Sequence, residues 1–329
     1  MKRLLLALAL VPLASCGLLQ TTQFEGNSSP PVGADAATEP FDGSTPGPDA
    51  GVAPLPPGAV RIATFNVHRF FDLVCDTGDC TETSYEELPT PAQFNAKADQ
   101  LAAAIRTLDA TVVLLEEVES QACLDALLTR LKPTFTGGVI GEIGSLASVD
   151  VAMLSRLPIV DVKKHRGQRL TRPDGSTTVF AREFLEVHLL DGAQRTIVFA
   201  AHFRSKVNDD PGRRLAEAQA AHDIVSAVAG AFPAALVVFG GDLNDTPGSP
   251  PLDALEAGGE LLRVEKEITP VSNAGTWGNQ AYAVPLDHLF QAVKAAGAPI
   301  AGTARVVRDS NSGLGGSDHA ALVADFRTK

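Results

Sequence analysis

The sequence lacks a hydrophobic run long enough to cross a bilayer, which takes about 20 apolar residues. Its first apolar run, residues 4–12, is too short for this and follows the basic residues Lys2 and Arg3. Small residues come next, before Cys16. A basic start, a short apolar run and small residues at a cleavage point are typical of a secretory signal. We therefore expect an exported protein without a membrane-spanning segment.

The end of this signal carries a lipidation pattern. Leu13-Ala14-Ser15-Cys16 resembles the lipobox of bacterial lipoproteins, in which the cysteine becomes the lipidated first residue of the mature protein. The pattern predicts a signal peptide over residues 1–15 and a membrane anchor at Cys16. Gly17 resembles the residue found in signals that are sorted to the outer membrane. We expect an outer-membrane lipoprotein on the periplasmic or cell-surface side.

Large apolar residues are scarce from residue 16 to residue 58, a stretch rich in Pro, Gly, Ser, Thr and Ala. Residues 17–60 also contain five acids and no Lys or Arg. Such a stretch cannot bury enough apolar surface to offset the loss of chain entropy, so it predicts a disordered tether. No second linker interrupts residues 59–329, which we interpret as one domain.

Cysteine is also rare, with four residues in 329. Cys75 and Cys80 close a short loop and are expected to form a disulfide in an exported protein, whereas Cys123 is expected to be a buried free thiol. The loop between them is rich in oxygen ligands, from Asp76 to Asp79, and is compatible with a calcium site. Acidic turns of this kind are also commonly solvated without an ion.

Polar residues with catalytic chemistry stand at the ends of apolar runs. Asp242 and Asn244 follow the run 235–239, and His319 precedes the run 320–323. Four further positions share this placement: Asn66, Glu117, His202 and Asp287. Carboxylates and amides hold a hard cation or orient a water, and an imidazole moves a proton or supports developing charge. The set predicts metal-assisted hydrolysis of phosphoesters.

The order of these motifs resembles the endonuclease–exonuclease–phosphatase superfamily of metal-dependent phosphodiesterases, from about residue 60 onward. The matching segments are Thr64-Phe65-Asn66-Val67, Glu117-Val118-Glu119, Ser155-Arg156-Leu157-Pro158, Ala201-His202-Phe203-Arg204-Ser205-Lys206, Gly240-Gly241-Asp242-Leu243-Asn244, Leu286-Asp287-His288 and Gly316-Ser317-Asp318-His319. The resemblance implies an α/β fold, a four-layer α/β/β/α sandwich of two packed mixed sheets with outer helices.

The residue pattern agrees with this fold class. Apolar residues recur at helical spacing over 94–108 and 212–228. The segments 151–154, 179–188 and 195–201 read as consecutive strands without intervening helices. A mixture of βα units and antiparallel runs favours two packed sheets with helices outside.

The resemblance also assigns roles. It implies that Mg²⁺ or Mn²⁺ is held by Asn66, Glu117 and Asp318, and that the attacking water is oriented by Asp242 and Asn244. It implies that His319, paired with Asp287, is either the general base or a phosphate-polarising imidazolium. His202 is expected to serve the leaving group. The sequence leaves open whether Asp242 or His319 takes the proton.

Three departures from the family pattern bear on the substrate. Glu116 stands where many relatives have Gln, and His68 where some have Asp. No Tyr lies between Tyr85 and Tyr282, although many nucleases of the family use one there to touch phosphate, and we expect Arg182 to serve instead. Trp277 lies in a Gly/Asn-rich loop, where it either contacts substrate or, as we favour, anchors the loop.

The net charge of −12 does not exclude a polyanionic substrate, because binding follows the local field and basic residues cluster in the domain. His202-Phe203-Arg204-Ser205-Lys206 is similar to the His-Phe-Lys-Ser-Lys of large secreted bacterial nucleases, which makes Arg204 a candidate substrate contact. We therefore expect a nuclease. The alternatives are a phosphodiesterase or phosphatase acting on phospholipids or small phosphoesters, and a non-catalytic binding lipoprotein. No protein partner can be inferred.

Overall fold

The computed structural model describes residues 54–81 and 83–329, so the signal peptide, Cys16 and most of the expected tether lie outside the described residues. The end of the expected tether is tied to the domain, because the Gly58 carbonyl accepts hydrogen bonds from the Thr328 main chain and hydroxyl at 3.1 and 2.9 Å. No helix in the described part of the chain is both long and apolar enough for a membrane span.

The first sheet contains both ends of the domain. Its order is β13-β15-β1-β2-β4-β3, with β14 paired to β15. The strands are β1 (Ala59–Phe70), β2 (Val112–Val118), β3 (Gly137–Gly141), β4 (Asp150–Ser155), β13 (Ala298–Pro299), β14 (Arg305–Val307) and β15 (Ala321–Arg327). β1 runs parallel to β2 and antiparallel to β15, so this is the mixed sheet that the sequence predicts.

The second sheet has the order β11-β12-β10-β9-β8-β5. The strands are β5 (Ile159–Lys164), β8 (Leu185–Asp191), β9 (Gln194–His202), β10 (Leu236–Asp242), β11 (Leu261–Arg263) and β12 (Asp287–Ala292), and the short β6 (Leu170–Thr171) and β7 (Thr177–Thr178) pair separately. The strand predicted over 179–188 begins only at Leu185. In the segment before it, the Ala181 amide donates to the Glu217 carboxylate at 2.6 Å instead of to a neighbouring strand.

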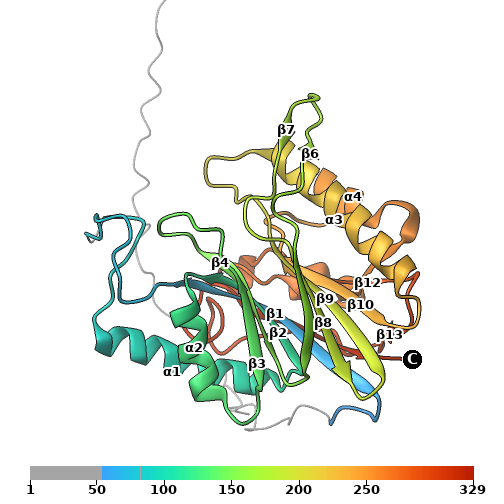
Figure 1. Cartoon of the computed structure of the whole chain (residues 1–329), viewed down its shortest axis with the longest axis horizontal. Helices are drawn as coiled ribbons and strands as arrows, with labels where there is room; N and C mark the ends of the chain where they lie inside the picture. The colour runs from blue at the N-terminus through green and yellow to red at the C-terminus, as the bar shows by residue number, and fades with distance from the viewer. Residues whose placement is uncertain (1–53, 82) are drawn as a thin grey trace, which may run out of the picture. The chain divides into compact units, whose positions relative to one another are not determined.

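Helices cover the outer face of each sheet (Figure 1). α1 (Pro91–Leu108) and α2 (Gln121–Leu131) lie on the first sheet, and α3 (Pro211–Ala231) and α4 (Pro250–Glu256) on the second. Short 3₁₀ turns follow in η1 (Ala257–Gly259), η2 (Val264–Glu267), η3 (Val271–Ala274) and η4 (Gln280–Tyr282). α1 begins with a capping box between Thr90 and Gln93 and ends at Asp109 in the left-handed conformation.

Three apolar clusters make these layers one domain. One lies between the first sheet and its helices, one between the second sheet and its helices, and the third between the two sheets. The third includes Ile62 of β1, Leu114 of β2, Val198 of β9, Val238 of β10 and Leu289 of β12. The predicted four-layer α/β/β/α sandwich is therefore confirmed.

The strand directions bring the predicted site residues to one edge. β1 is parallel to β2, and β9 is parallel to β10, so the carboxyl ends within each pair lie side by side. β12 is antiparallel to β10, which places its first residue, Asp287, directly opposite Asp242. Four predicted residues lie at or next to the ends of these strands: Glu117, His202, Asp242 and Asp287. The prediction that a strand ends at Asn66 is wrong, because β1 continues to Phe70 after a register shift that follows Asn66.

Candidate active site

Asp242 lies at the centre of the site. It is the last residue of β10 and pairs in register with His202 on one side and Asp287 on the other. Its carboxylate accepts hydrogen bonds from Asn66 Nδ2 at 3.0 Å and from the Asn244 amide at 2.9 Å. The Asp242 Oδ2 atom lies 3.6 Å from His202 Nε2. The two sheets thus meet at one carboxylate, with Asn66 contributed by the first and the others by the second.

Asn66 is fixed by the first sheet. Its side-chain carbonyl accepts a hydrogen bond from the His68 amide at 2.9 Å, and its main-chain carbonyl accepts one from the Ser317 hydroxyl at 2.7 Å. The Ser317 hydroxyl oxygen also accepts a hydrogen bond from the His319 amide at 3.0 Å. This contact joins β1 to the Ser317-Asp318-His319 turn, 251 residues away in the sequence.

Glu117 and Glu116 are adjacent on β2 but have different surroundings. Glu117 lines the active-site cavity, has a φ of 67°, and accepts the Arg69 amide at 2.9 Å. Glu116 is fully buried and accepts the Thr64 hydroxyl at 2.9 Å, while its Oε2 atom has no partner among the described residues. Burial, then repulsion by Asp287 and Asp242, raises the pKa of Glu116 well above its usual range. This shift favours the uncharged form of Glu116, which resembles the Gln that many relatives carry at this position.

The predicted pairing of His319 with Asp287 is present. His319 Nδ1 lies 2.9 Å from Asp287 Oδ2, and the Asp287 amide donates a hydrogen bond to the Thr276 hydroxyl at 3.2 Å. Burial by itself would lower the pKa of His319, but the Asp287 carboxylate, helped by Asp242 and Asp318, raises this pKa to about 10. The pairing with Asp287 therefore favours the imidazolium form of His319 at neutral pH.

The pKa of Asp242 is raised as well. Burial, followed by the charge of Asp287, raises the pKa of Asp242 to about 7, against the lowering effect of His319. A carboxylate with such a pKa can accept a proton from water near neutral pH. Burial, and then the charges of Arg182 and His319, lowers the pKa of His202 well below its usual range, so His202 is neutral. In its uncharged form, His202 can form a hydrogen bond with a leaving group.

Asp318 and Trp277 are joined at the cavity wall. The Trp277 indole Nε1 donates to Asp318 Oδ2 at 3.0 Å, while Asp318 Oδ1 has no partner among the described residues. Trp277 is 44% exposed and lines the cavity, so the interpretation that it only anchors its loop is incomplete. It both holds the loop to Asp318 and presents a ring face to the cavity.

The cavity over these residues has a volume of about 780 Å³. The predicted substrate contacts Arg182 and Arg204 both line it. Arg182 donates to the Phe203 carbonyl at 3.3 Å, and Arg204 donates to the carbonyls of Val207 and Asn208. The Asn244 side chain donates to the Phe203 carbonyl at 3.2 Å, so Nδ2 is turned to the protein and its Oδ1 is left to accept a hydrogen bond from a water.

The donor set fits a hard divalent cation. Asn66, Glu117 and Asp318 offer only oxygen atoms, which Mg²⁺ and Mn²⁺ prefer. Asp318 Oδ1 and Asp287 Oδ1 are buried oxygens without a hydrogen-bond donor among the described residues, and a buried charged oxygen is costly unless a cation or donor reaches it. Ligand atoms of Asp242, Asp287 and His319 also lie within 4.8 Å of one another, but Asp287 Oδ2 is already paired with His319 Nδ1.

A family model described as Endonuclease/Exonuclease/phosphatase family matches residues 63–319. The chain belongs to this family. Its members are hydrolytic, metal-dependent phosphoesterases, and the chain is therefore a metal-dependent phosphoester hydrolase. A search of curated protein sequences finds no match.

Solved structures share the fold at low sequence identity. The catalytic domain of human Nocturnin, with a bound sulfate anion, has a TM-score of 0.59 and 14% identity, covering 83% of this chain and 95% of that one. TDP2 of D. rerio, humanized by 14 mutations, has a TM-score of 0.55 and 17% identity, covering 82% and 100%. Sphingomyelinase C from Streptomyces griseocarneus has a TM-score of 0.53 and 19% identity, covering 81% and 99%.

The geometry divides the hydrolytic step among the side chains of this family member. A cation held by Asn66, Glu117 and Asp318 would polarise a phosphoryl oxygen and neutralise transition-state charge. Asp242 and Asn244 are placed to orient a water, and Asp242 is placed to accept its proton. His319, held by Asp287, is placed to donate a hydrogen bond to a phosphoryl oxygen and so to stabilise developing negative charge. His202 lies on the other side of Asp242, in position to hydrogen-bond the leaving oxygen.

The structure adds two residues that the sequence did not assign. Tyr85 and Arg69 both line the cavity, and the Arg69 guanidinium lies 4.8 Å from the centre of the Tyr85 ring. The sequence interpretation sought a phosphate-contacting tyrosine only between Tyr85 and Tyr282. The structure shows that Tyr85 itself lies at the cavity. It comes from the loop between β1 and α1, whose path to the cavity has no signature in the sequence.

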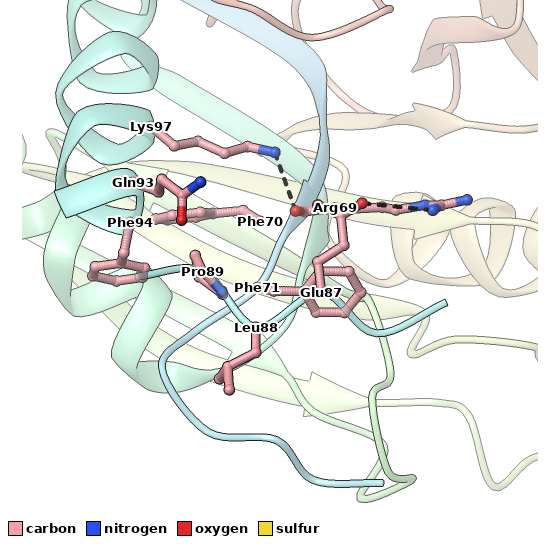
Figure 2. Close-up of a pocket in the computed structure, with 9 residues that line it drawn as sticks. All are labelled: Arg69, Phe70, Phe71, Glu87, Leu88, Pro89, Gln93, Phe94 and Lys97. Atoms are coloured by element: carbon pink, nitrogen blue, oxygen red, sulfur yellow. Dashed lines mark hydrogen bonds and ion pairs between the residues drawn. The ribbon is translucent and has the colours of Figure 1, made fainter. Parts of the chain in front are cut away.

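Arg69 is held in an unusual backbone conformation. His68 and Arg69 have φ values of 53° and 49°, which are uncommon for residues other than glycine. Lys97 of α1 reaches back and donates to both main-chain carbonyls, and Figure 2 shows this side chain directed at Arg69. Arg69 lines both the active-site cavity and the smaller adjoining pocket of about 210 Å³ drawn in Figure 2. Backbone strain of this kind is concentrated at functional sites.

Proposed function

We propose that this hydrolase is a nuclease that cleaves phosphodiester bonds of extracellular or periplasmic nucleic acid. The observation that carries the proposal is the composition of the cavity wall. Two aromatic rings, Tyr85 and Trp277, stand at the same cavity as the basic residues Arg69, Arg182, Arg204 and Lys206. Bases stack on aromatic faces, and basic side chains follow the phosphates, so this combination suits a single nucleic acid strand.

Arg182 is the basic residue best placed to contact a phosphate. Lys206 is paired with Asp245 at 3.1 Å, and Arg69 lies 3.9 Å from Glu87. Arg182 forms no ion pair among the described residues and donates only to a main-chain carbonyl. Its charge is therefore available to a substrate, as the sequence interpretation expects.

Export is the second part of the proposal. The predicted disulfide between Cys75 and Cys80 is present, and disulfides persist in oxidising compartments, which supports a location outside the cytoplasm. The signal and lipobox pattern of residues 1–16 supports a lipid anchor in the outer membrane.

A phospholipid or small phosphodiester is the alternative substrate. Val207, 74% exposed at the cavity, favours it, because an apolar rim can enter a lipid surface. Both alternatives use the same catalytic residues, so the choice depends on the wall of the cavity.

The test compares substrates on the full-length protein. With Mg²⁺ or Mn²⁺ present, we expect hydrolysis of plasmid DNA or RNA and little hydrolysis of sphingomyelin vesicles. Glu117→Gln removes a charged ligand while keeping the side-chain shape, and should abolish activity on every substrate. Arg182→Gln should raise KM for nucleic acid about tenfold and flatten its salt dependence, with a small effect on a chromogenic phosphodiester. Arg327→Gln, at the far end of β15 from His319, is the matched control. Preferential cleavage of sphingomyelin would overturn the nuclease proposal.

A further inference from the structure

Three acidic side chains outside the active site converge beside the disulfide loop. Asp76 lies within the Cys75–Cys80 loop, Glu86 follows it, and Glu119 lies just after β2. One oxygen atom from each of these three carboxylates lies within 4.8 Å of the others. Three carboxylates so close together repel one another unless a cation lies between them.

Glu119 provides the observation that distinguishes this cluster from an ordinary acidic turn. Its side chain is only 5% exposed. Its Oε2 atom accepts the Asp72 amide at 2.6 Å, while its Oε1 atom is buried and has no hydrogen-bond partner among the described residues. A buried carboxylate oxygen without a donor is costly, because water is lost and nothing replaces it.

No basic side chain compensates this charge. None of Asp76, Glu86 and Glu119 forms an ion pair with a Lys, Arg or His within residues 54–81 and 83–329. Glu86 is 2% exposed and its oxygens accept the main-chain amides of Asp76 and Thr77 at 2.5 and 2.8 Å and the Thr77 hydroxyl. These hydrogen bonds fix the position of the Glu86 carboxylate and stabilise its charged form, although no cationic side chain in the described residues pairs with it.

We propose that Asp76, Glu86 and Glu119 bind a structural Ca²⁺ ion, separate from the catalytic cation. All three ligands are oxygen, which suits a hard cation, and both cysteine sulfurs beside them are engaged in the disulfide. Ca²⁺ fits better than Mg²⁺, because the ligands come from a loop and Ca²⁺ accepts irregular geometry and bidentate carboxylates. The sequence indicated a site within Asp76 to Asp79, but Asp79 accepts the Ser84 hydroxyl, and the other two ligands come from Glu86 and Glu119.

This ion would connect the loop to the active site. Glu119 is two residues after Glu117, a ligand of the catalytic cation, and Tyr85 directly precedes Glu86 and lines the active-site cavity. The bound Ca²⁺ therefore holds the loop that carries Tyr85 against the end of β2. Without it, repulsion among these carboxylates opposes the approach of the loop to the end of β2.

The test measures Ca²⁺ binding directly, on the full-length protein with Glu117→Gln to weaken the catalytic site. Isothermal titration with CaCl₂ should show one site with a Kd of about 10⁻⁴–10⁻³ M, the range of extracellular calcium modules. Ca²⁺ should also raise the melting temperature. Adding Asp76→Asn, an exposed position whose change leaves the core intact, should weaken binding at least about tenfold, and Glu119→Gln should do the same. Asp79→Asn is the matched control, since it removes a charge from the same loop outside the cluster.

Two results would overturn the proposal. One is the absence of Ca²⁺ binding in the Glu117→Gln protein at millimolar concentrations. The other is an equal loss of affinity in Asp76→Asn and Asp79→Asn, which would show a general effect of loop charge. Because the readout is binding and melting temperature, a failed nuclease assay has no bearing on this result.

Discussion

At the level of single side chains, the pairing of His319 with Asp287 favours Asp242 as the group that takes the proton from water. The pairing raises the pKa of His319 to about 10, while the pKa of Asp242 is raised to about 7. The sequence could not separate these two alternatives, because it does not show that Asp287 lies 2.9 Å from the imidazole and that Asp242 is buried beside it.

The two members of the pair should act as one unit. We expect His319→Ala and Asp287→Ala each to lower kcat at least about 100-fold, because the imidazolium needs the carboxylate to stay charged and oriented. The double variant should be little worse than His319→Ala alone, since groups that act together are not additive. Steady-state kinetics on a soluble phosphodiester measures this. Multiplying losses in the double variant would mean that the residues act independently.

The pH profile should have two limbs. The pKa of Asp242 is raised to about 7, and Asp242 must be ionised to accept a proton. We therefore expect kcat/KM to fall as the pH drops through about 7. His319 must be protonated to polarise the phosphate, so kcat/KM should fall again as the pH rises through about 10. A bound cation favours the ionised form of Asp242, so saturating Mg²⁺ should move the lower limb to lower pH. If Asp242→Asn removed only the upper limb of the profile and kept the rise through pH 6 to 7, the assignment of the two limbs to Asp242 and His319 would be wrong.

At the level of elements, the end of β10 depends on a glycine. Gly241 has a φ of 143°, and a Cβ atom there would lie 1.8 Å from the Ala201 carbonyl oxygen of β9. Gly241 therefore allows β9 and β10 to approach closely beside Asp242. The strand pairing that sets Asp242 between His202 and Asp287 relies on this approach.

Gly241→Ala should accordingly destabilise the protein by about 3 kcal/mol or more, from steric overlap and backbone strain together. Gly230→Ala on α3 is the matched control, because a Cβ there meets nothing within 4 Å. That change should stabilise the protein by about 0.5–1 kcal/mol, since alanine favours helix. Urea denaturation measures both. Equal stability of the two variants would contradict the close approach of β9 and β10.

The same elements show how far the sequence leads. Apolar runs followed by Glu117, His202 and Asp242 marked the ends of β2, β9 and β10, because parallel strands place such residues at one edge, whereas β1 continues past Asn66 to Phe70. The loop between β1 and α1 offered no periodicity, so the position of Tyr85 in the cavity and the gathering of Asp76, Glu86 and Glu119 could not be predicted. Both depend on contacts between segments that have no local pattern.

At the level of the whole molecule, the uneven distribution of charge along the chain explains how an acidic protein can bind an anionic substrate. The five acids of residues 17–60 lie ahead of the domain in the sequence, while Arg69, Arg182, Arg204 and Lys206 line the cavity. Binding follows the local field, and this field is set by the cavity wall and its cation. The composition alone could not show this, because the net charge of −12 does not reveal where the charges lie.

The last prediction concerns the anchor, which acts on the location of the molecule and not on its chemistry. Cys16→Ser removes the thiol that would carry the lipid, and acyl chains supply about 0.8 kcal/mol of membrane affinity per buried CH₂. If the tether predicted from the sequence, about 40 residues long, behaves as a flexible chain, its root-mean-square reach is roughly 35 Å, so the anchor should not touch the active site. We expect Cys16→Ser to move the protein from the membrane pellet to the soluble fraction with unchanged kcat on soluble substrate. Ser28→Ala, in the same tract, is the control and should stay with the membrane. Cys16→Ser protein that still sediments with the membrane would refute the lipobox interpretation, while the active site and its predictions would stand.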